Sequence, residues 1–334
     1  MTSKSVTVSA TIVVALGLAA GAILLRMWVP EGLIWALTVG RQKSQITESL
    51  GARNAIPSDG RWDVSFGGMH VDNWQVAALP GVPRLRGLDF SHARLEDPGL
   101  TFLRALPGIE SLDLEGSNIT REALREVAKC PLVGWLDLSG THVDDASIAP
   151  LASLGRLYAV FLDRTTISDS GLLVLRRVKG LQQLSLGDTR VTDDGISQLV
   201  EAIPGLIYLN VQNCCVGSRT MRSVRLLTDL MDLNLEGTGV TDSDLEFLRG
   251  LHNLEVLDLY DTRVSSRAIA RLRSALPKLR PDGAIRCPER PAPGKPAPGP
   301  GNAGPGRASP VRRDVFPERG RKTGQNDFSL NIGR

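Results

Sequence analysis

The sequence predicts an α/β solenoid, a coil of parallel strands and short helices, with an apolar segment before it. Three observations predict this fold. An aliphatic strand pattern recurs about every 24 residues, a capping residue and a helical apolar spacing follow each copy, and proline steps end many of the units. A repeat of 20–29 residues cannot bury its own apolar face, so neighbouring units must stack on one another.

The first element in chain order is an apolar segment at residues 6–25, twenty residues without a charged side chain. As a helix rising ~1.5 Å per residue it would be about 30 Å long, the thickness of a bilayer's hydrocarbon core. Trp28 and Trp35 suit the interfacial zone beyond it. The segment therefore predicts a single-pass membrane anchor at 1–27. A cleaved signal peptide is the alternative, and the flanking charges leave the side of the membrane open.

Residues 28–61 are expected to join the anchor to the repeats and to form the N-terminal cap, and the repeats are expected to fill 62–283. Each unit starts with apolar, any, apolar, the pattern of a short strand with one buried face. One residue is inserted before the seventh copy. The nine copies are Val64-Ser65-Phe66, Leu88-Asp89-Phe90, Leu112-Asp113-Leu114, Leu136-Asp137-Leu138, Val160-Phe161-Leu162, Leu184-Ser185-Leu186, Leu209-Asn210-Val211, Leu233-Asn234-Leu235 and Leu257-Asp258-Leu259.

Helix signals follow each strand pattern. Thr192-Asp193 and Thr241-Asp242 are typical of a helix start, and aliphatic pairs such as Leu172/Leu175 and Leu245/Leu248 have the spacing of an amphipathic helix. A step such as Leu106-Pro107 then ends the helix. The sequence therefore predicts parallel strands on the concave face of the solenoid and short helices on its convex face.

These residues resemble the leucine-rich repeat superfamily, and more narrowly its cysteine-containing class and the bacterial proteins with threonine at the same position. The resemblance implies a solenoid and a protein-binding role. F-box adaptors typify the class, but residues 26–61 contain no F-box, so an adaptor role is not expected. Cys130 matches the second cysteine position. The column after the strands reads Met69, Ala93, Ser117, Thr141, Thr165, Thr189, Cys214, Thr238 and Thr262.

The outward strand positions predict the character of the concave face. Nine of them are acidic, four are aromatic and none is Lys or Arg. Such a face suits a protein partner with a basic segment. The alternative is that Asp after the strand leucine is usual in this repeat class, where it accepts local hydrogen bonds. The candidate partner-binding residues are Asp89, Asp113, Glu115, Trp135, Asp137, Phe161, Asp163, Tyr208, Asp232, Glu236, Asp258 and Tyr260.

Asp89, Asp113 and Asp137 are expected to form a column of like charges, because parallel strands stack ~4.8 Å apart. Each neighbouring pair would cost about 0.8 kcal/mol in water. These acids are expected to face solvent. Trp135 and Tyr208 are expected to be exposed, since the outward side of a strand offers no place to bury them. A basic rim is expected beside the acids, at His70, Arg94, His142, Arg190 and Arg263.

Catalytic motifs are missing from the sequence. It contains no G-x-x-x-x-G-K-[ST], G-x-S-x-G, H-E-x-x-H or C-x-x-C pattern. The four histidines and four cysteines show no metal-ligand spacing, so no metal or cofactor is predicted and the cysteines are expected to be free thiols. Asp193 and Asp194 are interpreted as helix caps rather than as an acid/base pair. A binding scaffold and a structural spacer of the cell envelope remain the two candidate functions.

The C-terminal residues 284–334 form a separate segment. Proline and glycine dominate 288–310, which predicts a disordered tail without a packed core. Residues 283–334 contain ten Lys/Arg and four Asp/Glu, a net charge of +6. The cations are scattered, so nucleic-acid binding is not expected. Their sign is compatible with a contact between the tail and the acidic concave face.

Overall fold

The computed structural model describes residues 43, 45–58 and 61–279. The expected anchor at 1–27 and the expected tail at 284–334 therefore lie outside the described residues. Within the described ranges, no helix combines the length and the apolar character needed to cross a membrane.

One sheet of ten strands organises the described part of the chain. Every neighbouring pair from β2 onward is parallel and joins equivalent positions of successive units, as Leu184 pairs with Leu209 across the inserted residue. The predicted strand register is confirmed. The strands are β1 (Asn54–Ser58), β2 (Arg61–Ser65), β4 (Leu85–Asp89), β6 (Ser111–Asp113), β7 (Trp135–Asp137), β8 (Ala159–Phe161), β9 (Gln183–Ser185), β10 (Tyr208–Asn210), β11 (Asp232–Asn234) and β12 (Val256–Asp258).

The first repeat unit makes two further strand pairings, one at the N-terminal edge of the large sheet and one in the loop after its strand. β1 pairs antiparallel with β2 and covers the first edge of the sheet, where unpaired backbone groups would otherwise invite association. Residues 45–50 form a helix just before it. On the loop side, β3 (His70–Val71) and β5 (Arg94–Leu95) form a second, two-stranded parallel sheet.

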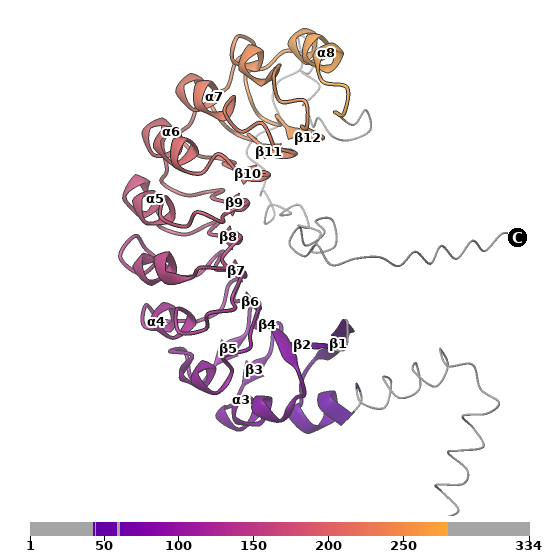
Figure 1. The fold of residues 1–334 in the computed structure, drawn as a ribbon, viewed down its shortest axis with the longest axis vertical. Helices are drawn as coiled ribbons and strands as arrows, with labels where there is room; N and C mark the ends of the chain where they lie inside the picture. Colours follow the sequence, from indigo (N-terminus) through magenta and orange to yellow (C-terminus); the bar gives the residue numbers. More distant parts are fainter. Residues whose placement is uncertain (1–42, 44, 59–60, 280–334) are drawn as a thin grey trace, which may run out of the picture. The chain divides into compact units, whose positions relative to one another are not determined.

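Helices lie on the outer side of the arc and strands on its inner side (Figure 1). Three units use a 3-10 turn where the apolar spacing predicted an α-helix, because an i, i+3 pair also fits three residues per turn. The α-helices are α3 (Asn73–Ala78), α4 (Ala123–Val127), α5 (Asp169–Leu175), α6 (Asp193–Ala202), α7 (Ser218–Val224) and α8 (Ser266–Ala275). The 3-10 turns are η1 (Leu79–Gly81), which follows α3, and η2 (Thr101–Ala105), η3 (Ala149–Ser153) and η4 (Asp244–Leu248).

The core lies between the two layers and is mostly aliphatic, with Phe66 and Phe90 stacked at the N-terminal end. Leu136 and Leu184, at the centres of their strands, are 0% exposed. Just after the strand, the hydroxyl of Thr141 donates to the carbonyl of Leu138 at 2.6 Å. Equivalent bonds at 2.6–2.7 Å form in five other units. The hydroxyl satisfies a strand carbonyl where the chain leaves the sheet, which explains why threonine or serine recurs there.

A left-handed residue follows each strand at the same position of every unit. Its φ lies between 52° and 71°. Glycine adopts this conformation at no steric cost, whereas other residues strain to adopt it. The nine positions are Gly68, His92, Gly116, Gly140, Arg164, Asp188, Asn213, Gly237 and Asp261.

Aspartates at the start of one helix cap the next helix along the solenoid. Asp193 accepts hydrogen bonds from the backbone amides of Gly217 and Thr220, at 2.9 and 2.8 Å. Within α6 itself, the side chain of Thr192 accepts from the amide of Asp194. The interpretation of Asp193 as a cap is confirmed, but it caps the following unit. Asp145, Asp169 and Asp242 bridge units in the same way.

Candidate functional site

The concave face carries one column of side chains at the last position of each strand. Asp89 pairs with Asp113, and Asp113 with Asp137, in the parallel register. These three residues are named the acidic block. Further along the same column stand three uncharged residues, named the neutral block. They are Ser185, Asn210 and Asn234.

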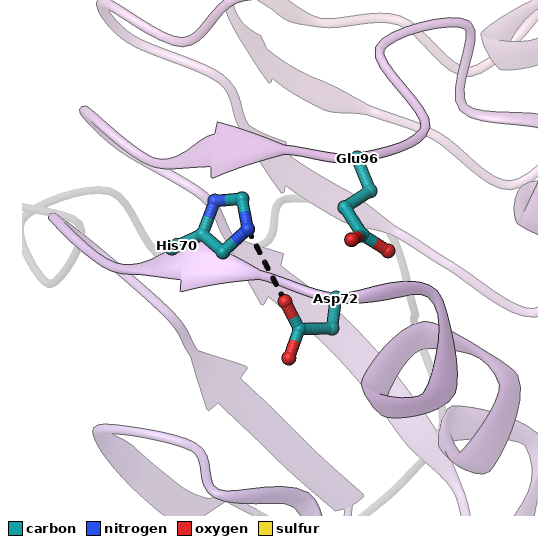
Figure 2. Close-up of side chains that lie close together, drawn as sticks. All are labelled: His70, Asp72 and Glu96. Carbon is teal, nitrogen blue, oxygen red and sulfur yellow. Dashed lines mark ion pairs between the residues drawn. The ribbon is translucent and has the colours of Figure 1, made fainter.

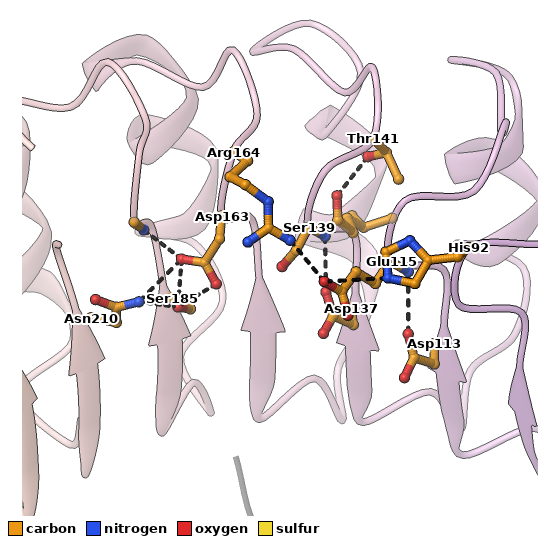
Figure 3. A network of polar contacts seen from close by, with 12 residues as sticks. His92, Asp113, Glu115, Asp137, Ser139, Thr141, Asp163, Arg164, Ser185 and Asn210 are labelled. Carbon is orange, nitrogen blue, oxygen red and sulfur yellow. Dashed lines mark hydrogen bonds and ion pairs between the residues drawn. The ribbon is translucent and has the colours of Figure 1, made fainter. Parts of the chain in front are cut away.

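Each Asp or Asn of this column folds back to accept the backbone amide two residues on. Asp137 accepts from the Ser139 amide at 2.8 Å (Figure 3), and Asn210 accepts from the Gln212 amide at 3.0 Å. The same bond forms at Asp89, Asp113, Asn234 and Asp258. At these six positions the turn uses an acceptor oxygen, and Asn supplies it without a negative charge.

The expectation that these acids face solvent is only partly met. Asp89, Asp113 and Asp137 are half-buried, and Asp258 is buried at 8% exposure. Burial, together with the nearby charge of Asp113, raises the pKa of the Asp137 carboxyl to about 7. The side chain lies close against the sheet because it bonds to its own turn. The predicted column of aspartates therefore exists, and at Asp137 burial raises the pKa more than the charge of Asp113 does.

Asp163 lies at the boundary between the acidic and neutral blocks. Its carboxylate accepts from the Ser185 hydroxyl at 2.7 Å, the Gly187 amide at 2.5 Å and the Asn210 amide group at 3.2 Å (Figure 3). Burial raises the pKa of this carboxyl. Asn210 also donates to the Ser185 hydroxyl at 2.9 Å. The neutral block thus supplies hydrogen-bond donors to the Asp163 carboxylate. The carboxylates of the acidic block are acceptors only, so they cannot supply such donors to one another.

The expectation that the concave aromatics are exposed is wrong for Trp135 and Tyr208. Trp135 is 9%, Phe161 2% and Tyr208 8% exposed. The ring centroids of Trp135 and Phe161 lie 5.3 Å apart, and those of Phe161 and Tyr208 lie 6.2 Å apart. The two outer rings project from β7 and β10 and reach Phe161 over the concave surface. These three residues are named the aromatic cluster. Tyr260, by contrast, is 47% exposed.

Basic side chains reach the acids from beside the column. Arg164 pairs with Glu115 at 2.7 Å, and Arg86 pairs with Asp63 at 2.7 Å. His92 lies 3.9 Å from Glu115. The predicted basic rim is exposed at all five of its positions. The ion pair with Arg164 holds Glu115 beside the acidic block. The charge of Glu115 also contributes to the raised pKa of Asp137.

The remaining candidate partner-binding residues lie at the C-terminal end of the sheet, on β11 and β12 and in the turns that follow them. Asp232 and Glu236 are half-buried beside β11, and Asp258 and Tyr260 belong to β12 and the turn after it. The neutral block separates them from the acidic block. The structure therefore brings together Asp113, Glu115 and Asp137 with the aromatic cluster and Asp163, and leaves a second, smaller acidic group at the end.

One group with metal-binding side chains was not predicted from the sequence. The donor atoms of His70, Asp72 and Glu96 lie within 4.8 Å of one another (Figure 2). Asp72 and Glu96 are 24 residues apart, so the repeat register was the signal that could have found them. Local bonds hold the carboxylates, since Asp72 accepts from Trp74 Nε1 and Glu96 from the Asn73 amide.

The donor set of this group, one imidazole and two carboxylates, suits zinc or manganese. The side chains are exposed, however, and His70 already pairs with Asp72 at 3.2 Å. Arg94 stands opposite His70 in the parallel register, and its positive charge would oppose a bound cation. The geometry of the group is accounted for by the start of α3 and one ion pair.

The described residues form an α/β solenoid of the leucine-rich-repeat type, with one parallel strand in each unit of about 24 residues. No protein-family model matches the chain, and no curated protein matches it. Among solved structures it is similar to an internalin (inlF) of Listeria monocytogenes strain 4b F2365, at 20% identity and a TM-score of 0.47. That match covers 61% of this chain and 68% of the internalin.

A second similar structure is internalin C2 (inlC2) from the same strain, at 21% identity and a TM-score of 0.42. The match covers 73% of this chain and 90% of that protein.

Proposed function

We propose that this chain is a protein-binding scaffold whose concave face recognises a cationic segment of a partner. The observation that carries the proposal is the charge of the acidic block. Asn210 and Asn234 make the same turn bond as Asp113 and Asp137 without a charge. The fold therefore does not require three stacked carboxylates, and their mutual repulsion is a cost that a bound cation would remove.

The aromatic cluster supports the same proposal. Trp135 projects from the strand that ends in Asp137, so the edge of its ring, 9% exposed, lies beside the acids. Interfaces with high affinity often combine aromatic anchors with arginine on the other partner. A guanidinium can pair with a carboxylate in two parallel hydrogen bonds and can also stack on a ring. A segment that alternates Arg with apolar residues is therefore the partner chemistry that fits this face.

The test uses fluorescent dodecapeptides of equal length, one rich in Arg and one rich in Glu, titrated against the full chain. We expect the Arg-rich peptide alone to bind. Reversing three concave acids, by Asp113→Lys, Asp137→Lys and Asp163→Lys, should weaken its binding at least tenfold. The matched control reverses three exposed acids away from the concave face, by Glu122→Lys, Glu201→Lys and Asp229→Lys, and should bind as the unchanged chain does.

Two results would contradict the proposal. Equal binding by the concave triple variant and the unchanged chain would exclude the concave face as the site. If neither peptide binds the unchanged chain even at high micromolar concentration, a structural role without a dedicated ligand becomes the better account. Circular dichroism of each variant shows that the solenoid has folded. Asn replacements at the same three positions keep the turn bonds, and they serve if the Lys variants unfold.

The apolar run at residues 6–25 supports a further part of the proposal, a membrane tether for the scaffold. Its length matches a bilayer's hydrocarbon core, and it contains no charged residue. Protease added to intact cells would digest the repeats only if they face outward. A chain that fractionates without membranes and begins at Ile23, after the small residues Ala20-Gly21-Ala22, would instead support a cleaved signal peptide.

A further inference from the structure

A small cavity lies between η4 and α8, the helical segments of the last two repeat units. Its volume is about 60 Å³, which is room for several water molecules. Leu245, Ala268 and Leu272 line it, and all three are buried. Five charged side chains and the hydroxyl of Ser265 complete the lining. The cavity therefore combines a fixed apolar part with a charged part, as ligand sites do.

Both carboxylates of the cavity are engaged by neighbouring groups. Asp242 accepts from the Ser265 amide at 2.5 Å and from the Ser265 hydroxyl at 2.7 Å. Glu246 pairs with Arg249 at 2.8 Å. Asp242 thus caps the following unit, and Glu246 neutralises one guanidinium. Neither carboxylate accounts for the other two arginines of the lining.

Those two arginines, Arg267 and Arg271, are four residues apart on α8. Side chains at this spacing lie on the same face of a helix, where like charges destabilise it. Both are exposed, and neither forms an ion pair within the described part of the chain. Two like charges without an acidic partner therefore line the cavity, at a cost to the helix that carries them.

The C-terminal end of the solenoid is cationic as a whole. Residues 263–279 contain five cations and no acid, whereas α6, three units earlier, contains three acids and no cation. A terminal unit needs a polar outer face to stay soluble, and acids would serve that need as well as arginines do. The uniform positive charge beside the cavity therefore points to an anionic ligand.

We propose that the cavity between η4 and α8 binds a phosphate group through Arg267 and Arg271, with Arg249 contributed from the η4 side. The site is separate from the concave face and does not rest on the proposed function. A guanidinium presents forked N–H donors that match two oxygens of a phosphate. A phosphate group carries about 1.5–2 negative charges at pH 7 and at least three acceptor oxygens, so it can bind both guanidiniums at once. A carboxylate, with one charge and two oxygens, satisfies only one of them.

The test titrates the full chain with inorganic phosphate and with glycerol 3-phosphate, in mild detergent and at constant ionic strength. Calorimetry follows the binding. The site variant carries Arg267→Gln and Arg271→Gln, since glutamine is about as favourable in a helix as arginine. The matched control carries Arg177→Gln and Arg225→Gln, two exposed arginines just after α5 and α7 that also form no ion pair among the described residues.

We expect the unchanged chain and the control to bind phosphate equally, and the site variant to bind it at least tenfold more weakly. Glu246→Gln should tighten the binding about threefold to tenfold, because it removes a negative charge and releases Arg249 from its ion pair. A gain of affinity cannot come from a damaged fold. The chain with Asn at Asp113, Asp137 and Asp163 should bind phosphate as the unchanged chain does, so the two proposals fail separately.

Three results would overturn the phosphate site. The unchanged chain would bind no phosphate even at about 10 mM, the site variant would bind as tightly as the unchanged chain, or acetate would compete as well as phosphate. The two probes distinguish the source of the group. Tighter binding of glycerol 3-phosphate supports an organic ester such as a lipid headgroup, and tighter binding of inorganic phosphate supports the free ion.

Discussion

The acidic block and the neutral block occupy the same column of the same sheet, and Asn210 and Asn234 make the same turn bond as the three aspartates, yet the two blocks differ in charge. In the neutral block, Asn210 donates to Ser185 and to Asp163, so the side chains satisfy one another. In the acidic block, carboxylates stand beside carboxylates, and burial, together with the charge of Asp113, raises the pKa of Asp137 to about 7. The comparison separates the acceptor oxygen that Asp and Asn both offer at the strand end from the stacked negative charge that only the acidic block adds.

The largest expected effect comes from substitutions in the core, which test whether the same packing supports both blocks. Leu136, beneath the acidic block, and Leu184, beneath the neutral block, are both 0% exposed at strand centres. Replacing either with Ala should lower the free energy of unfolding by about 2–5 kcal/mol, from lost burial and a residual cavity. Urea unfolding measures both. Costs that differ by more than about 2 kcal/mol would mean that the blocks also differ in their core.

Exchanging charge between the blocks should give the next largest effect. The raised pKa of Asp137 means that the folded chain holds a proton which the unfolded chain releases near pH 4. Its stabilisation is therefore complete below about pH 4, falls as the pH rises, and is lost above about pH 7. Asp137→Asn should raise the free energy of unfolding at pH 8 by about 2 kcal/mol, below a ceiling of about 4 from 1.36 kcal/mol per pKa unit.

The reverse exchange is Asn210→Asp, which places a second carboxylate beside Asp163 and removes two donated bonds. We expect it to destabilise the chain by about 2 kcal/mol at pH 8 and by less at pH 4. Chemical unfolding of the Asp137→Asn and Asn210→Asp variants at pH 4 and pH 8 measures both changes in the free energy of unfolding. If Asp137→Asn gives the same gain at pH 4 and pH 8, charge repulsion is not the reason that the acidic block is costly.

The pH dependence of partner binding should distinguish the blocks more finely. A cationic peptide favours ionised Asp137, whose pKa is about 7. Its ionised fraction rises about tenfold between pH 6 and pH 8, so affinity should rise up to about tenfold over that range. Asp137→Asn should remove most of this rise. Isothermal titration in two buffers of different ionisation enthalpy would also detect the proton that the unchanged chain releases on binding.

The aliphatic triplets predicted the strand register because their period is the period of the sheet, and the inserted residue was visible as a step of 25. The same pattern could not predict the burial of Phe161, since its neighbours Trp135 and Tyr208 belong to other units. It also could not distinguish a 3-10 turn from an α-helix. The acids were predicted at their positions, but their bonds to their own turns depend on side-chain rotamers that no residue spacing reveals.

The left-handed position after each strand gives the smallest effect and a last contrast between the blocks. Near the acidic block it is Gly140, with φ of 65°, and near the neutral block it is Asn213, with φ of 54°. A Cβ on Gly140 would have its nearest contacts at 3.7 Å, so Gly140→Ala meets no clash. Its only cost is the strain of an alanine in the left-handed conformation, ~1–2 kcal/mol. The lower conformational entropy of the unfolded variant partly offsets this strain.

We expect Gly140→Ala to cost about 1 kcal/mol in urea unfolding. Asn213→Gly is its counterpart, because it relieves a left-handed asparagine but removes the 2.8 Å bond to Asp188. Since these two effects oppose each other, its net change should be under about 0.5 kcal/mol. A cost above 3 kcal/mol for Gly140→Ala would mean that the strand end cannot adjust at all. In that case the acids of this block are held by a rigid backbone as well as by their own turn bonds.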